Sequence, residues 1–149
     1  MNIVPTNVNY NYSLMFQNLV TLNQAYTFLN IQTVGKSILG KNIYVIKLGK
    51  GSKKVFYSAS IHANEWITSV LLMKFIEDYC IAYSNNSKIY NYSIKRLFDS
   101  VSIYIMPMVN PDGVDLVTSS LDKNSIAYLN AQNISNQFSY IHFPSRLES

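Results

Sequence analysis

The segment that most constrains the fold is the apolar run from Val101 to Met108, which reads V-S-I-Y-I-M-P-M and is followed by N-P-D-G. A short apolar run that ends in turn-forming residues is typical of a buried strand. Its apolar residues do not alternate strictly with polar ones, which favours a sheet covered by helices on both faces. The sequence therefore predicts an α/β domain.

Two more strands are predicted upstream of this run. The segment from Asn42 to Leu48 reads N-I-Y-V-I-K-L, and the segment from Val55 to Ile61 reads V-F-Y-S-A-S-I. Both are rich in β-branched and aromatic residues, and the G-K-G-S-K-K between them is a turn signal. We expect a hairpin, or at least two neighbouring strands.

Three helices are predicted around these strands. The first has Ser13 as its N-cap and buries one face. The second runs from Trp66 to about Tyr83 and is apolar on nearly all sides in its first half, and a weaker third runs from Ile89 to Phe98. The resulting order of helix, strand, strand, helix, helix, strand favours a mixed sheet. The buried face of the first helix consists of Met15, Leu19, Leu22, Tyr26 and Leu29.

Composition places the chain among globular proteins. Its 149 residues are 48% hydrophobic and 13% charged, which fits one domain over residues 1–149 and argues against disorder. No apolar run approaches the roughly 20 residues that cross a bilayer, and the first ten residues have neither the basic end nor the apolar stretch of a signal peptide. We expect no membrane partner and a cytoplasmic location.

The cysteine and lysine residues narrow the possible ligands. Because Cys80 is the single cysteine, disulfides and thiolate metal clusters are excluded, and any metal must be held by His, Asp or Glu. The net charge of +4 comes from scattered lysines, which are densest around the glycine-bearing turn. We interpret this group as a solvated hairpin tip and expect no nucleic-acid partner, because no aromatic platform or arginine cluster accompanies it. The lysines concerned are Lys47, Lys50, Lys53 and Lys54.

The segment that carries chemistry is S-A-S-I-H-A-N-E-W-I-T, residues 58–68. His62 and Glu65 fall where a strand is predicted to end and a helix to begin, and both residue types are good zinc ligands. Catalytic zinc usually has three protein ligands, so a third must come from elsewhere in the fold. The alternative is an exposed turn histidine beside a glutamate that the helix dipole favours.

Several linked motifs resemble the zinc carboxypeptidase family, the carboxypeptidase A-like metallopeptidases. They are H-A-N-E-W-I-T with the helix that follows it, G-K-S-I-L-G-K-N-I at residues 35–43, the upstream helix opening at Tyr12, and P-M-V-N-P-D-G-V-D-L at 107–116, in family order. The match is most similar to bacterial γ-D-glutamyl-diamino-acid endopeptidases that cut peptidoglycan stem peptides. The resemblance covers residues 5–118 and implies a carboxypeptidase-like (phosphorylase/hydrolase-like) fold.

The resemblance implies a zinc cofactor, with His62 and Glu65 as two of its three ligands. It makes Asn64 a substrate-binding residue, since digestive carboxypeptidases commonly have an arginine there and asparagine fits the peptidoglycan-directed branch better. We interpret N-P-D-G at 110–113 as a structural type I turn, with direct catalytic contact as the alternative. Trp66 is interpreted as a core anchor.

The family takes its third ligand, a histidine, and its general base, a glutamate, from far downstream. Here His142 is the other histidine and matches no family motif, Arg146 is a weak match to the family's Asn-Arg pair, and Glu148 is next to the last residue. We expect residues 119–149 to be a loop-rich tail with one short helix near 126–131, and we assign no catalytic residue. The chain is expected to be the N-terminal half of a catalytic domain.

The resemblance implies a zinc metallopeptidase directed at γ-D-glutamyl-diaminopimelate bonds, with a peptide or peptidoglycan stem peptide as substrate. In the family mechanism, zinc polarises the scissile carbonyl and acidifies a water while a glutamate acts as general base. Two alternatives stay open: a non-catalytic, pseudoenzyme-like fragment, and a zinc N-acyl amino acid acylase of the same fold. The oligomeric state is not predicted.

Overall fold

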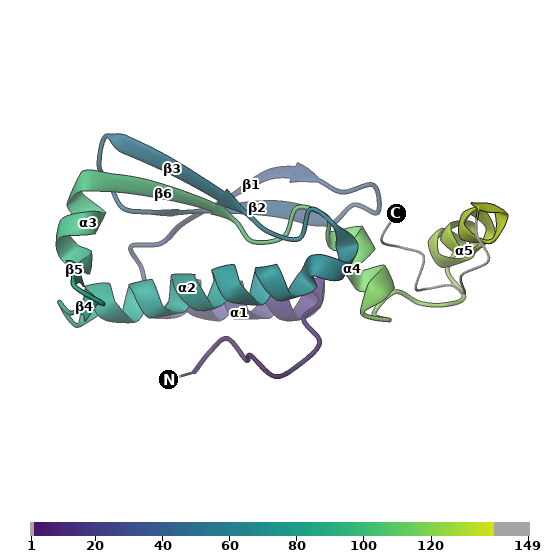
Figure 1. Ribbon diagram of the computed structural model, residues 1–149, viewed down its shortest axis with the longest axis horizontal. Coiled ribbons are helices and arrows are strands. Elements are labelled where there is room, and N and C mark those ends of the chain that lie inside the picture. The colour runs from purple at the N-terminus through teal and green to yellow at the C-terminus, as the bar shows by residue number, and fades with distance from the viewer. Residues whose placement is uncertain (1, 139–149) are drawn as a thin grey trace.

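The centre of the protein is a four-stranded mixed sheet in the order β1-β2-β6-β3 (Figure 1). The computed structural model describes residues 2–138. Strand β2 is antiparallel to both β1 and β6, whereas β3 and β6 are parallel. The predicted mixed sheet is therefore confirmed. The strands are β1 (Asn30–Lys36), β2 (Asn42–Leu48), β3 (Lys53–Ser58) and β6 (Val101–Met106).

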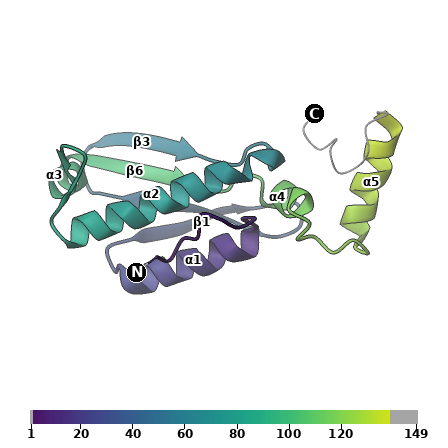
Figure 2. The ribbon, with the colours of Figure 1, turned by 60° about the horizontal axis from the view of Figure 1, so that its bottom comes forward.

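The core lies between this sheet and two helices, α1 (Tyr12–Ala25) and α2 (Trp66–Ser84), which cover the same face (Figures 1 and 2). The sheet contributes alternate residues of its two central strands, and these four side chains are buried. The predicted second helix is confirmed, as is its packing on a sheet that contains both β3 and β6, although these strands end before the predicted residues 61 and 108. The four sheet residues are Ile46 and Leu48 of β2 and Ile103 and Ile105 of β6.

The opposite face of the sheet has no helix among residues 2–138. The Nζ atom of Lys47 lies 5.8 Å from the centre of the Tyr104 ring on that face, and Phe56 of the neighbouring strand is 57% exposed. The expectation of helices on both faces is met on one face only. This face is covered by its own side chains and not by a second layer of helices, so it is partly open to solvent.

The predicted hairpin of β2 and β3 is wrong, and so is the alternative that the two are neighbouring strands, because β6 lies between them. The loop between the two strands instead crosses the start of β6: a Cβ on Gly49 would lie 2.1 Å from the carbonyl oxygen of Val101, and one on Gly51 would lie 1.9 Å from the carbonyl carbon of Ser100. These glycines are needed for a close backbone approach, not for a hairpin tip. On the side away from β6, β2 pairs with β1, a polar and largely exposed strand that the apolar pattern did not predict.

Helix ends also differ from the predictions. The side chain of Asn11, not that of Ser13, caps α1 by accepting from the backbone N–H of Leu14 at 2.9 Å. The segment predicted as one weak helix is a short hairpin, β4 (Lys88–Ile89) with β5 (Tyr92–Ser93), followed by α3 (Ile94–Ser100). Ser93 caps α3 and so sets its start.

The C-terminal part contains more helix than expected. Helix α4 (Pro111–Val117) follows β6, and α5 (Ile126–Phe138) is longer than the short helix predicted within a loop-rich tail. Ser125 stabilises the start of α5, since its hydroxyl accepts from the backbone N–H of Tyr128 at 3.2 Å. Within residues 2–138, no helix has both the length and the apolar character needed to cross a membrane.

The N-terminal segment is held by a buried carboxylate. Glu77 of α2 is fully buried, accepts from the backbone N–H groups of Ile3 and Val4, and pairs with Lys74 at 2.9 Å. Burial by itself raises the pKa of Glu77, but the two backbone hydrogen bonds and the lysine outweigh it, so the pKa lies below its ordinary value. The charged form therefore stabilises the folded state.

We expect Glu77→Gln to lower the free energy of unfolding by about 2 kcal/mol at pH 7, because a charged hydrogen-bond acceptor is lost in a buried place. Because its pKa is lowered in the folded state, Glu77 stabilises that state at a pH above the ordinary glutamate pKa of about 4.3. This stabilisation is lost as the pH falls through the pKa of the folded state. The gap between wild type and variant should therefore narrow from pH 5 to pH 3 in urea titrations. The control is Asp78→Asn, the exposed partner of the same lysine. A gap that stays constant with pH would contradict the assignment.

Candidate metal centre

The candidate site lies on the turn that joins β3 to α2. Because β3 and β6 are parallel, the loops that follow them leave the same edge of the sheet and hydrogen bond to each other. The backbone N–H of Val109 donates to the carbonyl of Ala59 at 2.9 Å, and that of Asn110 donates to the carbonyl of Ser60 at 3.0 Å. The chain thus enters the candidate site from a fixed position.

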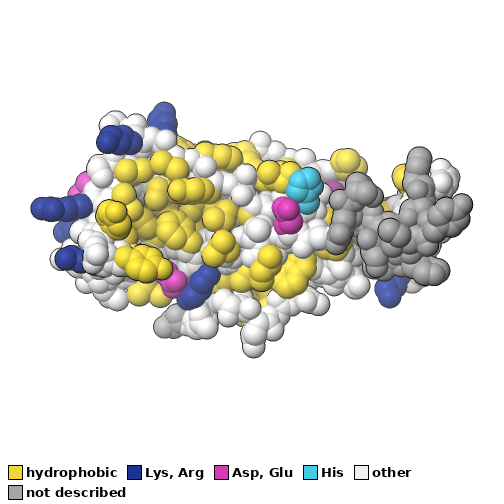
Figure 3. All heavy atoms as spheres, viewed as in Figure 1, with side chains coloured by type: hydrophobic (Ala, Val, Ile, Leu, Met, Phe, Trp, Pro, Cys, Tyr) yellow, Lys and Arg dark blue, Asp and Glu magenta, His cyan; other side chains and the backbone are white. Residues whose placement is uncertain are grey.

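His62 is the N-cap residue and Glu65 the last residue of a single 3-10 turn, η1 (Ala63–Glu65), directly before α2. Both side chains are exposed. Figure 3 shows a histidine (cyan) and an acidic side chain (magenta) side by side on the surface, at the margin of an apolar area. The structure therefore places both predicted ligands on one strand-to-helix turn.

Neither side chain is engaged elsewhere in the described part of the chain. No hydrogen bond or ion pair within residues 2–138 involves the imidazole of His62 or the carboxylate of Glu65. An imidazole nitrogen and a carboxylate oxygen are donors that zinc accepts, so the pair fits this metal. Residues 2–138 contain no group of three His, Cys, Asp or Glu side chains that could hold a metal, so the third donor is not among them.

The other predicted site residues have different settings. Asn64 is half-buried within η1, between the two candidate ligands in sequence. Trp66 is half-buried and packs against the core, which agrees with its interpretation as an anchor. His142, Arg146 and Glu148 lie outside the described residues.

The N-P-D-G motif begins a helix and is not an isolated type I turn. The side chain of Asn110 caps α4 by accepting from the N–H of Gly113 at 3.0 Å, and Pro111 is the first helical residue. A Cβ on Gly113 would lie 3.0 Å from the Cβ of Ala63. The glycine thus lets α4 pack closely against η1, beneath the candidate ligands.

A buried charge cluster fixes α4 to the first part of the chain. Lys41 pairs with Asp112 at 3.2 Å and with Asp115 at 2.8 Å, and these side chains are at most 19% exposed. Asp112 also accepts from the hydroxyl of Ser37 and the N–H of Leu39, both at 2.9 Å. The sequence did not predict this cluster, because its lysine and its two aspartates belong to motifs about 70 residues apart.

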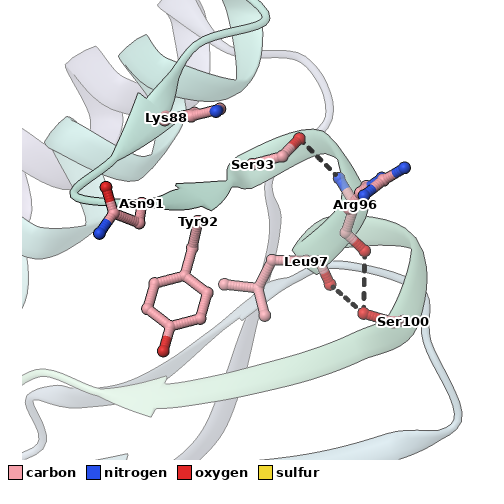
Figure 4. Close-up of a pocket in the computed structure, with 7 residues that line it drawn as sticks. All are labelled: Lys88, Asn91, Tyr92, Ser93, Arg96, Leu97 and Ser100. Atoms are coloured by element: carbon pink, nitrogen blue, oxygen red, sulfur yellow. Dashed lines mark hydrogen bonds between the residues drawn. The ribbon is translucent and has the colours of Figure 1, made fainter.

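A hollow of about 330 Å³ lies elsewhere on the molecule (Figure 4). Tyr92 of β5 and Arg96 of α3 are among its lining residues. These elements follow the C-terminal end of α2, whereas His62 precedes its N-terminal end. Because the 19 residues of α2 span about 28 Å, the hollow is separate from the candidate metal centre.

Known proteins are similar to this chain in sequence. Residues 15–141 match the zinc carboxypeptidase family, which extends past residue 118 of the resemblance seen in the sequence. The chain is 42% identical over 116 residues to γ-D-glutamyl-L-diamino acid endopeptidase 1 of Lysinibacillus sphaericus, covering 78% of this chain and 29% of that protein. The chain thus spans less than a third of the length of this relative.

Solved structures agree on the fold. Bovine thrombin-activatable fibrinolysis inhibitor, in complex with tick carboxypeptidase inhibitor, gives a TM-score of 0.63 at 23% identity, over 75% of this chain and 34% of that one. A metallo-carboxypeptidase from Pseudomonas aeruginosa gives 0.55 at 18% identity, over 86% and 37%. The protein is thus an α/β protein with part of a carboxypeptidase-like fold. It belongs to the zinc carboxypeptidase family, whose members are metallopeptidases.

We expect Lys41→Met to lower the free energy of unfolding by about 2 kcal/mol, since it leaves two partly buried carboxylates without their cation. Urea denaturation measures this change. The matched control is Lys50→Met, whose partner Asp99 is at a similar distance of 3.1 Å in an exposed pair. Its change should stay within about 0.5 kcal/mol, because exposed ion pairs contribute little. Equal effects of the two substitutions would show that the cluster does not hold α4 in place.

Proposed function

We propose that this protein is a zinc-dependent peptidase that cleaves γ-D-glutamyl–diamino acid bonds of cell-wall stem peptides, with His62 and Glu65 as zinc ligands. The observation that carries the proposal is the pair itself: two exposed, unengaged zinc donors on one strand-to-helix turn of a zinc carboxypeptidase-family chain.

The chain's own residues have separable tasks in this proposal. When bound, zinc supplies Lewis-acid chemistry that polarises a scissile carbonyl and acidifies water. His62 offers a neutral imidazole nitrogen and Glu65 a carboxylate oxygen, which η1 holds three residues apart in sequence. Asn64, between them, offers an amide donor and an acceptor to a polar substrate group.

The substrate class rests on two supports. A relative at 42% identity is named for cleavage next to a γ-D-glutamyl–L-diamino acid unit. At position 64 this chain has an asparagine, a neutral residue that can hydrogen bond to an amide or carboxylate without the fixed charge of an arginine. Both favour a stem peptide over an ordinary C-terminal residue.

We further propose that additional polypeptide of a complete catalytic domain covers the surface between β3 and α2 and brings the third ligand and the general base. Hydrophobic side chains gather there beside the candidate ligands (Figure 3). Four of them are exposed although they belong to the sheet edge and to the adjoining helix, and large exposed apolar areas mark interaction sites. They are Val55 (37%), Tyr57 (49%), Ile67 (54%) and Leu71 (67%).

A non-catalytic role is the second candidate. It is favoured by one observation: no third metal donor lies near His62 and Glu65 in residues 2–138. The same observation leads us to expect that the 149-residue chain alone, with zinc, hydrolyses neither γ-D-glutamyl-diaminopimelate peptides nor ordinary peptides with a free C-terminus. A missing general base costs about 10²- to 10⁴-fold in rate.

The experiment is a chimera in which this chain replaces the matching part of the Lysinibacillus sphaericus endopeptidase. We expect the zinc-loaded chimera to cleave γ-D-glutamyl-diaminopimelate peptides at least 100-fold faster than the isolated chain, and Glu65→Gln in the chimera to abolish turnover. Ordinary peptides with a free C-terminus are the comparison substrates.

Three outcomes would each contradict a part of the proposal. Cleavage of ordinary C-terminal residues alone would refute the substrate class. A folded, zinc-loaded chimera that cleaves neither substrate would instead support the non-catalytic candidate. Turnover by the isolated chain that Glu65→Gln removes would show that its own residues complete the site.

A further inference from the structure

The backbone before the candidate ligands reverses at Ser60, whose φ is +49°. Residues with a side chain rarely adopt this left-handed backbone conformation, and glycine is the residue that suits it best. Ser60 is nevertheless a serine, and it is 1% exposed. A residue in an unfavourable conformation next to a candidate site calls for a reason that glycine could not supply.

The hydroxyl of Ser60 links the two ends of the ligand turn. It donates to the backbone carbonyl of Glu65 at 3.2 Å and lies 2.6 Å from the hydroxyl of Ser69. Since the Ser60 hydroxyl has one proton, the hydroxyl of Ser69 is the donor in the second bond. Ser69 is fully buried in α2, so the pair forms beneath the exposed ligands.

Thr68 adds a second link between the same two residues. Its hydroxyl oxygen accepts from the N–H of Ser60 at 2.9 Å and donates to the carbonyl of Glu65 at 2.6 Å. The carbonyl of Ser60 accepts from the N–H of Asn110, so every polar group of Ser60 is hydrogen bonded. Both candidate ligands therefore lie within a loop, residues 60–65, that is closed twice at its base.

We propose that Ser60 is a positioning residue for the metal centre, which fixes the separation and orientation of His62 and Glu65. It acts through its hydroxyl, which bonds to Glu65 and Ser69, and through its N–H, which bonds to Thr68. This inference rests on the proposed function, in which that pair holds zinc. Zinc affinity then depends on these hydrogen bonds of Ser60 and not on the backbone conformation alone. Partners that orient metal ligands typically change affinity by about 10- to 100-fold when removed.

The test is the zinc affinity of the full 149-residue chain, measured by NMR from the ring signals of His62 and the amide signals of η1 as zinc is added. Ser60→Gly removes the hydroxyl and relieves the backbone. We expect it to weaken zinc binding about 10-fold or more while the urea midpoint stays within error or rises. The matched control is Ser119→Gly, because Ser119 is an exposed serine with a φ of +56° that lies beyond the C-terminal end of α4. It should leave zinc affinity unchanged.

His62→Ala and Glu65→Gln separate this inference from the proposed function. If both lose zinc binding while Ser60→Gly binds as the wild type does, the positioning inference is wrong and the metal site stands. If neither substitution changes zinc affinity, the metal site is wrong and the inference falls with it.

Thr68 supplies a second pair of variants should Ser60→Gly fail to fold. Thr68→Val removes the hydroxyl that links Ser60 to Glu65 at nearly constant shape, whereas Thr68→Ser keeps it. We expect Thr68→Val to weaken zinc binding by about 10-fold and Thr68→Ser to retain wild-type affinity. Equal affinities of the two variants would overturn the inference.

Discussion

The candidate site depends on the ion pairs of one lysine. Lys41 lies in the turn between β1 and β2, and its contacts with Asp112 and Asp115 join that turn to α4. Asp115 also accepts from the N–H of Tyr12 and so fixes the start of α1. Because Gly113 of α4 packs on Ala63 of η1, this cluster determines where the candidate ligands lie relative to the sheet. Charges far apart in sequence thus support the turn that holds the candidate ligands.

The site combines rigid support below with free donors above. The hydroxyls of Ser60, Thr68 and Ser69 are hydrogen bonded beneath the turn, whereas His62 and Glu65 are exposed. A metal centre needs both properties, since ligands must be positioned yet unengaged. The apolar surface of β3 and α2 begins at the same place, so a segment that covers it would also approach the metal. In our proposal one docking event therefore completes both the core and the site.

Local patterns predicted local structure well. Strand β2 and helix α2 follow from β-propensity and apolar content, and the position of His62 and Glu65 on one strand-to-helix turn was predicted from the sequence. The strand order was mispredicted because Gly49 and Gly51 signal a tight turn in sequence, whereas their role is contact with the backbone of Ser100 and Val101. Strand β1 lacks an apolar pattern because it is an exposed edge. The Lys41 cluster joins residues about 70 positions apart, which no local pattern reveals.

The central claim is that the turn between β3 and α2 holds zinc through His62 and Glu65. X-ray absorption at the zinc edge, on the chain loaded with one equivalent of zinc, tests it most directly, because imidazole gives a distinct outer-shell signal. The sequence has two histidines, which makes the controls complete. The account predicts that His62→Ala removes the imidazole signal and that His142→Ala leaves it intact. An imidazole signal that survives His62→Ala and disappears in His142→Ala would contradict the account.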